Sequence, residues 1–210
     1  MHKNVKRVIT YIDGFNLYYG LKSKGWRRYY WLDPRQLGTQ LLRPGQELVA
    51  TKYFTARIAA DPRDPEKHRR QQLFIEAIET LPETRIFYGH YLQKPQSCFA
   101  CGAKWMSHEE KMTDVNVAVE LLSDAFDNAF DTAIVISADS DLAPPISLIR
   151  SRFPEKRIIV ACPPDRRSQR LESVAHGYFS IGRKTIQDSQ FPDKVIKPNG
   201  FVLARPLRWR

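Results

Sequence analysis

Short apolar runs alternate along this chain with segments in which apolar residues recur every three or four positions. The runs hold few polar residues and are typical of strands covered on both faces, whereas the periodic segments are typical of amphipathic helices. The pattern predicts strands at residues 5–12, 47–58, 84–92, 132–137, 157–162 and 178–181. It predicts helices that begin near Phe15 and Pro34, and further helices at residues 66–81, 113–126, 145–152 and 167–175.

This alternation of strands and helices predicts an α/β fold, in which a mainly parallel sheet lies between two layers of helices. The 210 residues are enough for one such domain with a sizeable core. We expect the domain to occupy residues 1–182, with an irregular insertion at about residues 93–110. Residues 183–210 contain three prolines and are expected to form a basic tail packed on the domain.

The charge of the chain favours a polyanionic partner. Lys and Arg total 33 against 23 Asp and Glu, a net charge of +10, and such a surplus is typical of nucleic-acid-binding proteins, although it also serves solubility. No apolar stretch approaches the roughly 18 residues that would span a bilayer, and the N-terminus lacks the pattern of a secretory signal. We therefore expect a cytoplasmic protein that is not bound to a membrane and keeps its three cysteines reduced.

Two of the predicted strands end in carboxylates. Asp13 follows the first strand, and Asp139 and Asp141 follow the strand at 132–137. Because ligands of parallel sheets bind beyond the carboxyl ends of the strands, these side chains would meet in one crevice if the two strands are neighbours. Asp114 is a fourth candidate at the start of the helix predicted at 113–126, where an acid also serves simply to complement the helix dipole.

Four carboxylates in one pocket raise one another's pKa unless a cation balances their charge. Hard oxygen ligands suit Mg²⁺ or Mn²⁺ better than zinc, which prefers nitrogen and sulfur. Such an ion lowers the pKa of bound water and neutralises charge at phosphorus. The pattern therefore favours hydrolysis of a phosphodiester without a covalent intermediate.

Three motifs occur in order along the chain: Asp13-Gly-Phe-Asn16, Lys111-Met-Thr-Asp114 and Ser137-Ala-Asp139-Ser-Asp141. Together they resemble the NYN domain, a branch of the PIN-like nuclease superfamily that includes LabA-like proteins, and the resemblance covers roughly residues 5–182. It implies a three-layer PIN-like fold and metal-dependent ribonuclease activity on RNA, with the four aspartates as the acidic residues. It also implies that Asn16 orients a metal-bound water or a phosphate, and that Ser137 and Lys111 support the site or contact phosphate.

Two other functions remain open at this point. One is a non-catalytic RNA-binding or regulatory protein that retains the PIN-like pocket without turnover. The other is a phosphatase of the haloacid dehalogenase type, because Asp139-x-Asp141 after a strand imitates its nucleophile motif. That nucleophile normally follows the first strand, and only 69 residues follow Asp141 in this chain, which argues against the phosphatase.

The predicted insertion contains a possible zinc site. Cys98 and Cys101 form a Cys-x-x-Cys pair, and His90 and His108 flank it at spacings that would complete a tetrahedral set of four ligands. The alternative is a pair of free thiols, with His90 at the end of a strand and His108 in solvent. Cys162 lies in a predicted buried strand and is expected to belong to the core.

Basic residues that could contact phosphate occur in several segments. Arg166, Arg167 and Arg170 are favoured, because they begin a helix that follows a strand's carboxyl end, on the same rim as the acids. Further candidates lie near both ends of the chain and in the helix at 66–81: Arg27, Arg28, Lys67, Arg69, Arg70, Arg205, Arg208 and Arg210. The aromatic residues at 26 and 29–31 would either stack on unpaired bases or pack as a cover over the core.

Overall fold

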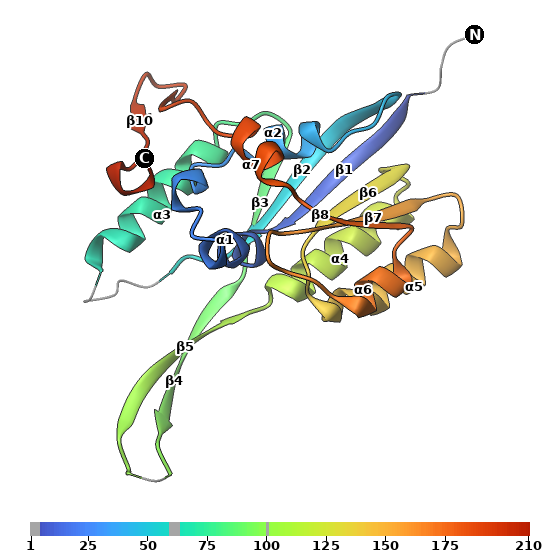
Figure 1. The fold of residues 1–210 in the computed structure, drawn as a ribbon. Helices are drawn as coiled ribbons and strands as arrows, with labels where there is room; N and C mark the ends of the chain where they lie inside the picture. The colour runs from blue at the N-terminus through green and yellow to red at the C-terminus, as the bar shows by residue number, and fades with distance from the viewer. Residues whose placement is uncertain (1–4, 59–63, 100) are drawn as a thin grey trace.

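The centre of the molecule is a six-stranded parallel sheet with the strand order β3-β2-β1-β6-β7-β8. A computed structural model describes residues 5–58, 64–99 and 101–210, without the side chains of residues 91–95 and 105–111. The strands of the sheet are β1 (Lys6–Asp13), β2 (Gln46–Thr55), β3 (Thr84–Tyr88), β6 (Thr132–Ile136), β7 (Arg157–Cys162) and β8 (Gly177–Ser180). Helices cover both faces (Figure 1), which confirms the predicted three-layer α/β/α architecture with its parallel sheet.

Alternate residues of the central strands supply the two halves of the core. Val8 and Ile12 of β1 point into one half, and Ile9 and Tyr11 point into the other, as the two-residue period of a strand requires. All five residues of β6 are buried. The two strands therefore read as nearly continuous apolar runs in the sequence, because each is covered on both faces.

The helices divide between the two faces of the sheet. One core half contains buried side chains of α1 (Gly14–Ser23), α2 (Pro34–Gln40), α3 (Pro65–Ile78) and α7 (Arg183–Asp188). The other contains those of α4 (Thr113–Phe126), α5 (Ala143–Arg152) and α6 (Gln169–Val174). In the part of the chain that the structure describes, no helix is both long and apolar enough to cross a membrane.

The segment predicted as an irregular insertion is a β-hairpin, so that prediction is wrong. β4 (His90–Ser97) pairs antiparallel with β5 (Lys104–Lys111), and the hairpin projects away from the sheet (Figure 1). The predicted strand at 84–92 accordingly ends as β3 at Tyr88, and β4 begins two residues later. The hairpin sequence is mostly polar and contains Pro95, so an apolar pattern could not reveal it.

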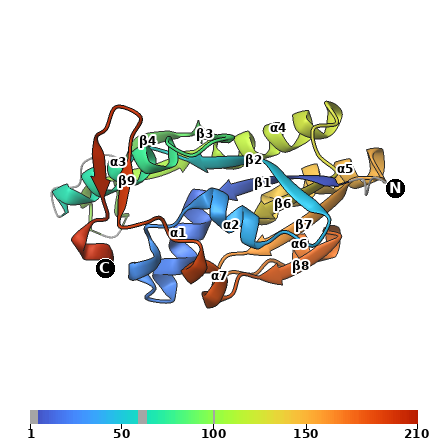
Figure 2. The same ribbon diagram turned by 90° about the horizontal axis from the view of Figure 1, so that it is seen from above.

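The C-terminal segment crosses the face formed by α1, α2 and α3. It contains α7, a hairpin of β9 (Lys194–Ile196) and β10 (Val202–Ala204), and a final 3₁₀ turn η3 (Leu207–Trp209), which lies beside α3 (Figure 2). The indole nitrogen of Trp31 donates a 2.8 Å hydrogen bond to the carbonyl of Pro192. Trp209 is buried, with its ring centroid 6.3 Å from that of Trp31. These contacts make the segment part of the core on this face.

We expect Trp209→Ala to lower the free energy of unfolding by about 3 kcal/mol, because it removes a large ring from a packed aromatic cluster. Urea denaturation measures the change. Leu207→Ala is the matched control in the same turn, since Leu207 is 77% exposed and its loss should cost less than about 0.5 kcal/mol. Equal effects of the two substitutions would contradict a buried role for Trp209.

Candidate acidic site

The site lies where the strand order reverses direction. β1 pairs with β2 on one side and with β6 on the other, and chain connections lead outward from this centre in both directions. Ile12 is opposite Ile136, so the residues that follow these two positions leave the sheet side by side. In open parallel sheets this switch point, at the carboxyl ends of the strands, is where ligands bind. Asp13 and the Ser137–Asp139 loop occupy it.

Asp13 is the buried centre of the site. It is 5% exposed, ends β1 and caps the N-terminus of α1, where its Oδ1 accepts a 2.9 Å hydrogen bond from the backbone N–H of Asn16. Its Oδ2 accepts a 3.2 Å hydrogen bond from the hydroxyl of Ser137. An aspartate is a favoured N-cap, so the same side chain serves the helix and the site.

Ser137 and Asn16 fix the loop that follows β6. The Ser137 hydroxyl accepts a 3.0 Å hydrogen bond from the backbone N–H of Asp139, and the Asn16 carbonyl Oδ1 accepts one of 3.2 Å from the N–H of Ala138. The Asp139 carboxylate in turn accepts a 2.9 Å hydrogen bond from the N–H of Asp141. In this structure Ser137 and Asn16 therefore position the acids.

The pKa of Asp13 is raised to about 7, mainly because burial penalises its charged form. The charges of Asp114 and Asp139 raise it further, whereas the hydrogen bonds from Asn16 and Ser137 lower it. The structure therefore brings Asp114 and Asp139 within electrostatic reach of Asp13. Asp141 is exposed, and it contributes to the loop through its backbone N–H.

Asp114 is positioned by the attachment of α4 to the sheet. It lies in the first turn of α4 and is half-buried. Further along the helix, Glu120 and Asp124 each form a 2.6 Å ion pair with the buried Lys52 of β2. At the start of the helix, the Asn116 amide donates a 3.3 Å hydrogen bond to the carbonyl of Tyr88.

The donor chemistry of the site fits a hard divalent cation. Two carboxylates, Asp114 and Asp139, raise the proton affinity of the buried Asp13, and a bound cation would offset this repulsion. Carboxylate oxygens are preferred ligands of Mg²⁺ and Mn²⁺. As they stand, however, no three His, Cys, Asp or Glu side chains within the described ranges are grouped so that they could hold a metal ion. A shared ion would have to draw the carboxylates closer together.

The predicted zinc ligands His90, Cys98 and Cys101 lie at opposite ends of the hairpin. His90 is opposite Lys111 at the base, whereas Cys98 and Cys101 lie in the turn at the tip. Eight strand residues span about 26 Å, far beyond what one ion bridges, so a site that combines His90 with both cysteines is wrong for this structure. The side chain of His108, like that of Lys111, lies outside the described residues.

The three arginines favoured for phosphate binding are spread along the loop after β7 and into α6. The guanidinium carbon of Arg166 lies 6.0 Å from the ring centre of Tyr19 on α1. Arg166 and Arg167 help to line a shallow hollow of about 560 Å³. Arg170 is exposed within α6. The residues that line the hollow do not include Asp13, Asp114, Asp139 or Asp141.

A deeper cavity of about 390 Å³ adjoins the acidic site, and the acid-centred prediction missed it. Gly14 and Phe15, which directly follow Asp13, line it together with Tyr53 and Thr55 at the end of β2. A Cβ atom on Gly14 would lie 2.6 Å from the Tyr53 hydroxyl oxygen, so α1 approaches β2 more closely there than other residues permit. The position of residues 53–55 at a strand's carboxyl end was the available signal.

Fold and site together define a doubly wound α/β protein with a buried aspartate, Asp13, at its switch point. The chain belongs to the NYN domain family, whose pattern matches residues 7–182, as the three motifs predicted. The match leaves the C-terminal segment outside the family region.

Two curated proteins resemble the chain. One is the 6-hydroxy-3-succinoylpyridine 3-monooxygenase HspA of Pseudomonas putida strain S16, 30% identical over 190 residues, which are 75% of this chain and 59% of that protein. The chain thus matches little more than half the length of HspA. The other is the low amplitude and bright protein LabA of Synechococcus elongatus strain PCC 7942, 24% identical over 201 residues and 94% of both chains.

A solved structure shares the fold. It is the protein of unknown function VPA0982 from Vibrio parahaemolyticus, with a TM-score of 0.55 and 20% identity over 91% of this chain and 99% of that one. At this identity the similarity concerns the fold alone.

The raised pKa of Asp13 predicts a pH-dependent stability in the presence of EDTA. The unfolded chain releases this proton near its ordinary pKa of 3.8 and the folded protein near 7, so the free energy of unfolding should fall as the pH rises between these values. In Asp13→Asn this part of the decrease in the free energy of unfolding should be absent. Urea denaturation at several pH values compares the two proteins, with the exposed Asp188→Asn as control. Identical pH profiles of wild type and Asp13→Asn would contradict the prediction.

Proposed function

We propose that the protein is a metal-dependent ribonuclease that hydrolyses RNA phosphodiester bonds. The observation that carries this proposal is the burial of Asp13 beside Asp114 and Asp139 at the switch point of the sheet. The family supports the same chemistry, because NYN domains are generally nucleases that act on RNA. The net charge of +10 also favours a polyanionic substrate.

Asp13, Asp114 and Asp139 would hold Mg²⁺ or Mn²⁺, with Asp141 as a further ligand at the rim. A bound ion supplies a water of lowered pKa and neutralises charge on the phosphate. Ser137 holds one oxygen of Asp13, and the backbone N–H of Asn16 holds the other, so that this carboxylate keeps one orientation. Asn16 also holds the loop that carries Asp139, and Lys111 is proposed to contact phosphate.

The first experiment is the substitution of Asp13 or Asp139 by Asn. Each should reduce Mn²⁺-dependent cleavage of a 5′-labelled RNA roughly a hundredfold or more, because a ligand charge is lost, and should leave RNA binding measurable. Asp188→Asn is the control, since Asp188 lies on α7 and pairs with Lys184.

Three outcomes would reject the nuclease. They are full activity of both variants, cleavage that persists in excess EDTA, and binding of RNA without any cleavage by the wild type. The last outcome would favour a non-catalytic RNA-binding protein. Hydrolysis of p-nitrophenyl phosphate in place of RNA would favour the phosphatase.

A second candidate function is the oxygenation of a small aromatic compound. HspA is named as a monooxygenase of a substituted pyridine, and the cavity beside Asp13 is lined by aromatic and basic side chains that suit such a ring. Because the chain matches only 59% of the length of HspA, we rank this candidate below the nuclease.

Direct assay distinguishes the oxygenase from the nuclease. The protein is supplied with 6-hydroxy-3-succinoylpyridine, oxygen and a reduced nicotinamide or flavin, and loss of the pyridine is followed by chromatography. For an oxygenase we expect oxygen and the pyridine to disappear in equal amounts. We expect no RNA cleavage by the wild type or by Asp13→Asn in that case. No loss of the pyridine would exclude this candidate.

A further inference from the structure

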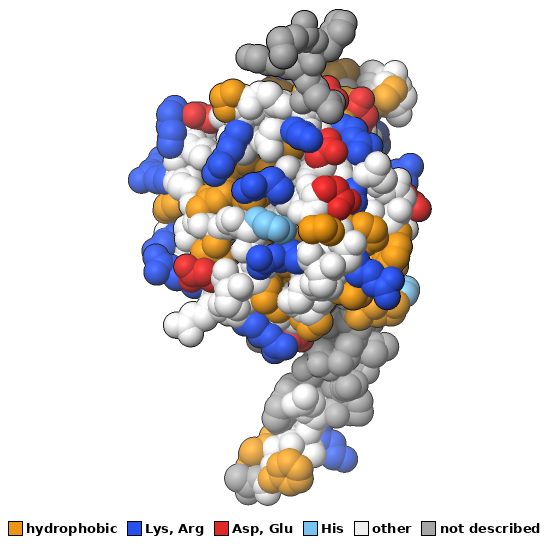
Figure 3. All heavy atoms as spheres, turned by 90° about the vertical axis from the view of Figure 1, so that its right-hand side faces the viewer, with side chains coloured by type: hydrophobic (Ala, Val, Ile, Leu, Met, Phe, Trp, Pro, Cys, Tyr) orange, Lys and Arg blue, Asp and Glu red, His pale blue; other side chains and the backbone are white. Residues whose placement is uncertain are grey.

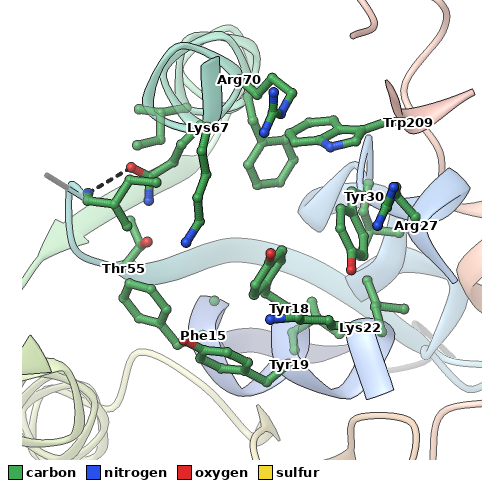
Figure 4. A pocket seen from close by; sticks show the side chains of 18 of the residues that line it. Phe15, Tyr18, Tyr19, Lys22, Arg27, Tyr30, Thr55, Lys67, Arg70 and Trp209 are labelled. Carbon is green, nitrogen blue, oxygen red and sulfur yellow. Dashed lines mark hydrogen bonds between the residues drawn. The ribbon is translucent and has the colours of Figure 1, made fainter. Parts of the chain in front are cut away.

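The cavity beside Asp13 lies between α1 and α3 and is closed on one side by the C-terminal turn (Figure 4). Its volume of about 390 Å³ falls within the range of small-molecule sites. Its wall is formed mainly by residues of α1, the segment 27–32, the end of β2, α3 and η3.

Aromatic rings form a continuous part of the wall. The ring centroids of Tyr18 and Tyr30 are 5.0 Å apart, those of Tyr30 and Trp209 are 5.9 Å apart, and those of Trp209 and Phe74 are 6.2 Å apart. The rings meet one another at tilted or edge-on angles. Planar rings of this kind suit stacking against another aromatic ring.

Basic side chains form the remainder of the polar lining. The lining contains five cations, Lys22, Arg27, Lys67, Arg70 and Arg208, and among its described residues only one carboxylate, Asp64. Asp64 forms ion pairs with Arg70 at 2.6 Å and with Arg208 at 2.9 Å.

Three of these cations are available to a ligand. Among the described residues, Lys22, Arg27 and Lys67 take part in no ion pair. Lys67 points from α3 into the space between Thr55 and Tyr18 (Figure 4). The face shown in Figure 3, by contrast, has Lys and Arg scattered across it rather than gathered around a hollow.

We propose that this cavity binds a planar aromatic ring that carries an anionic group, as a nucleotide does, with the ring against the tyrosines and Trp209 and the anion at Arg27 and Lys67. Stacking and charge-assisted hydrogen bonds are the two contacts that a nucleotide offers. This inference rests on the proposed function, because the cavity would then hold a base of the RNA substrate. A base held beside Gly14 and Phe15 would bring the adjoining phosphodiester to Asp13.

The test is binding of AMP to the full chain, measured by calorimetry in EDTA so that neither metal nor cleavage is needed. We expect a dissociation constant below about 1 mM. Ribose 5-phosphate, which lacks the ring, and adenosine, which lacks the anion, should each bind roughly tenfold more weakly or worse.

Matched double variants locate the site. Arg27→Ala with Lys67→Ala should weaken AMP binding at least tenfold, because both cations face the cavity. Arg28→Ala with Arg69→Ala removes the same charge from adjacent exposed positions on the same two segments, and should change binding less than twofold. Circular dichroism checks that both variants are folded. Equal losses in the two variants would overturn the proposal, because diffuse charge would then explain the binding.

Nicotinate, a small aromatic carboxylate, separates the two sources of such a ligand. Binding of AMP in preference to nicotinate would identify a nucleotide site, and the reverse preference would identify a site for free aromatic acids; both support the proposal. Binding of neither below about 1 mM, or equal binding of AMP and ribose 5-phosphate, would overturn it. AMP binding without RNA cleavage would support the proposed binding site and reject only the nuclease.

Discussion

The structure of the site depends on one buried carboxylate that serves two purposes. Asp13 caps α1 through the N–H of Asn16 and meets the loop after β6 through Ser137. An isolated charge in such a position would be costly, and the hydrogen bonds and the raised pKa reduce that cost. The helix start, the loop and the electrostatics of the crevice are therefore coupled at a single side chain.

The predictable parts of the fold are those in which burial produces a regular pattern of apolar residues in the sequence. β1 and β6 are covered on both faces, so their apolar runs and the acids after them were found from the pattern. β4 and β5 were not, because a ribbon away from the sheet needs no apolar face. The short α7 is likewise held by tertiary packing of Ile186 rather than by a helical pattern of its own.

The acids and the adjoining cavity also differ in how far the sequence predicts them. Asp13 and Asp139 could be paired in advance, because strand ends of a parallel sheet meet at one edge. The cavity could not be predicted. Arg27, Lys67 and Arg208 are each candidates for phosphate contact in the sequence, but nothing in their spacing indicates that they line one cavity with Trp209. Separate segments converge there because the C-terminal turn folds back, so that Trp209 packs against Phe74 of α3 and the turn contacts residues 27–29.

The hairpin of β4 and β5 is joined to the acidic site through very little chain. β5 ends at Lys111 and α4 begins at Thr113, so Met112, in a left-handed conformation with φ of 78°, is the single link between the arm and the helix that carries Asp114. Because one residue joins the two elements, a displacement of the hairpin would reach the first turn of α4, where Asp114 lies, with almost no intervening chain to absorb it.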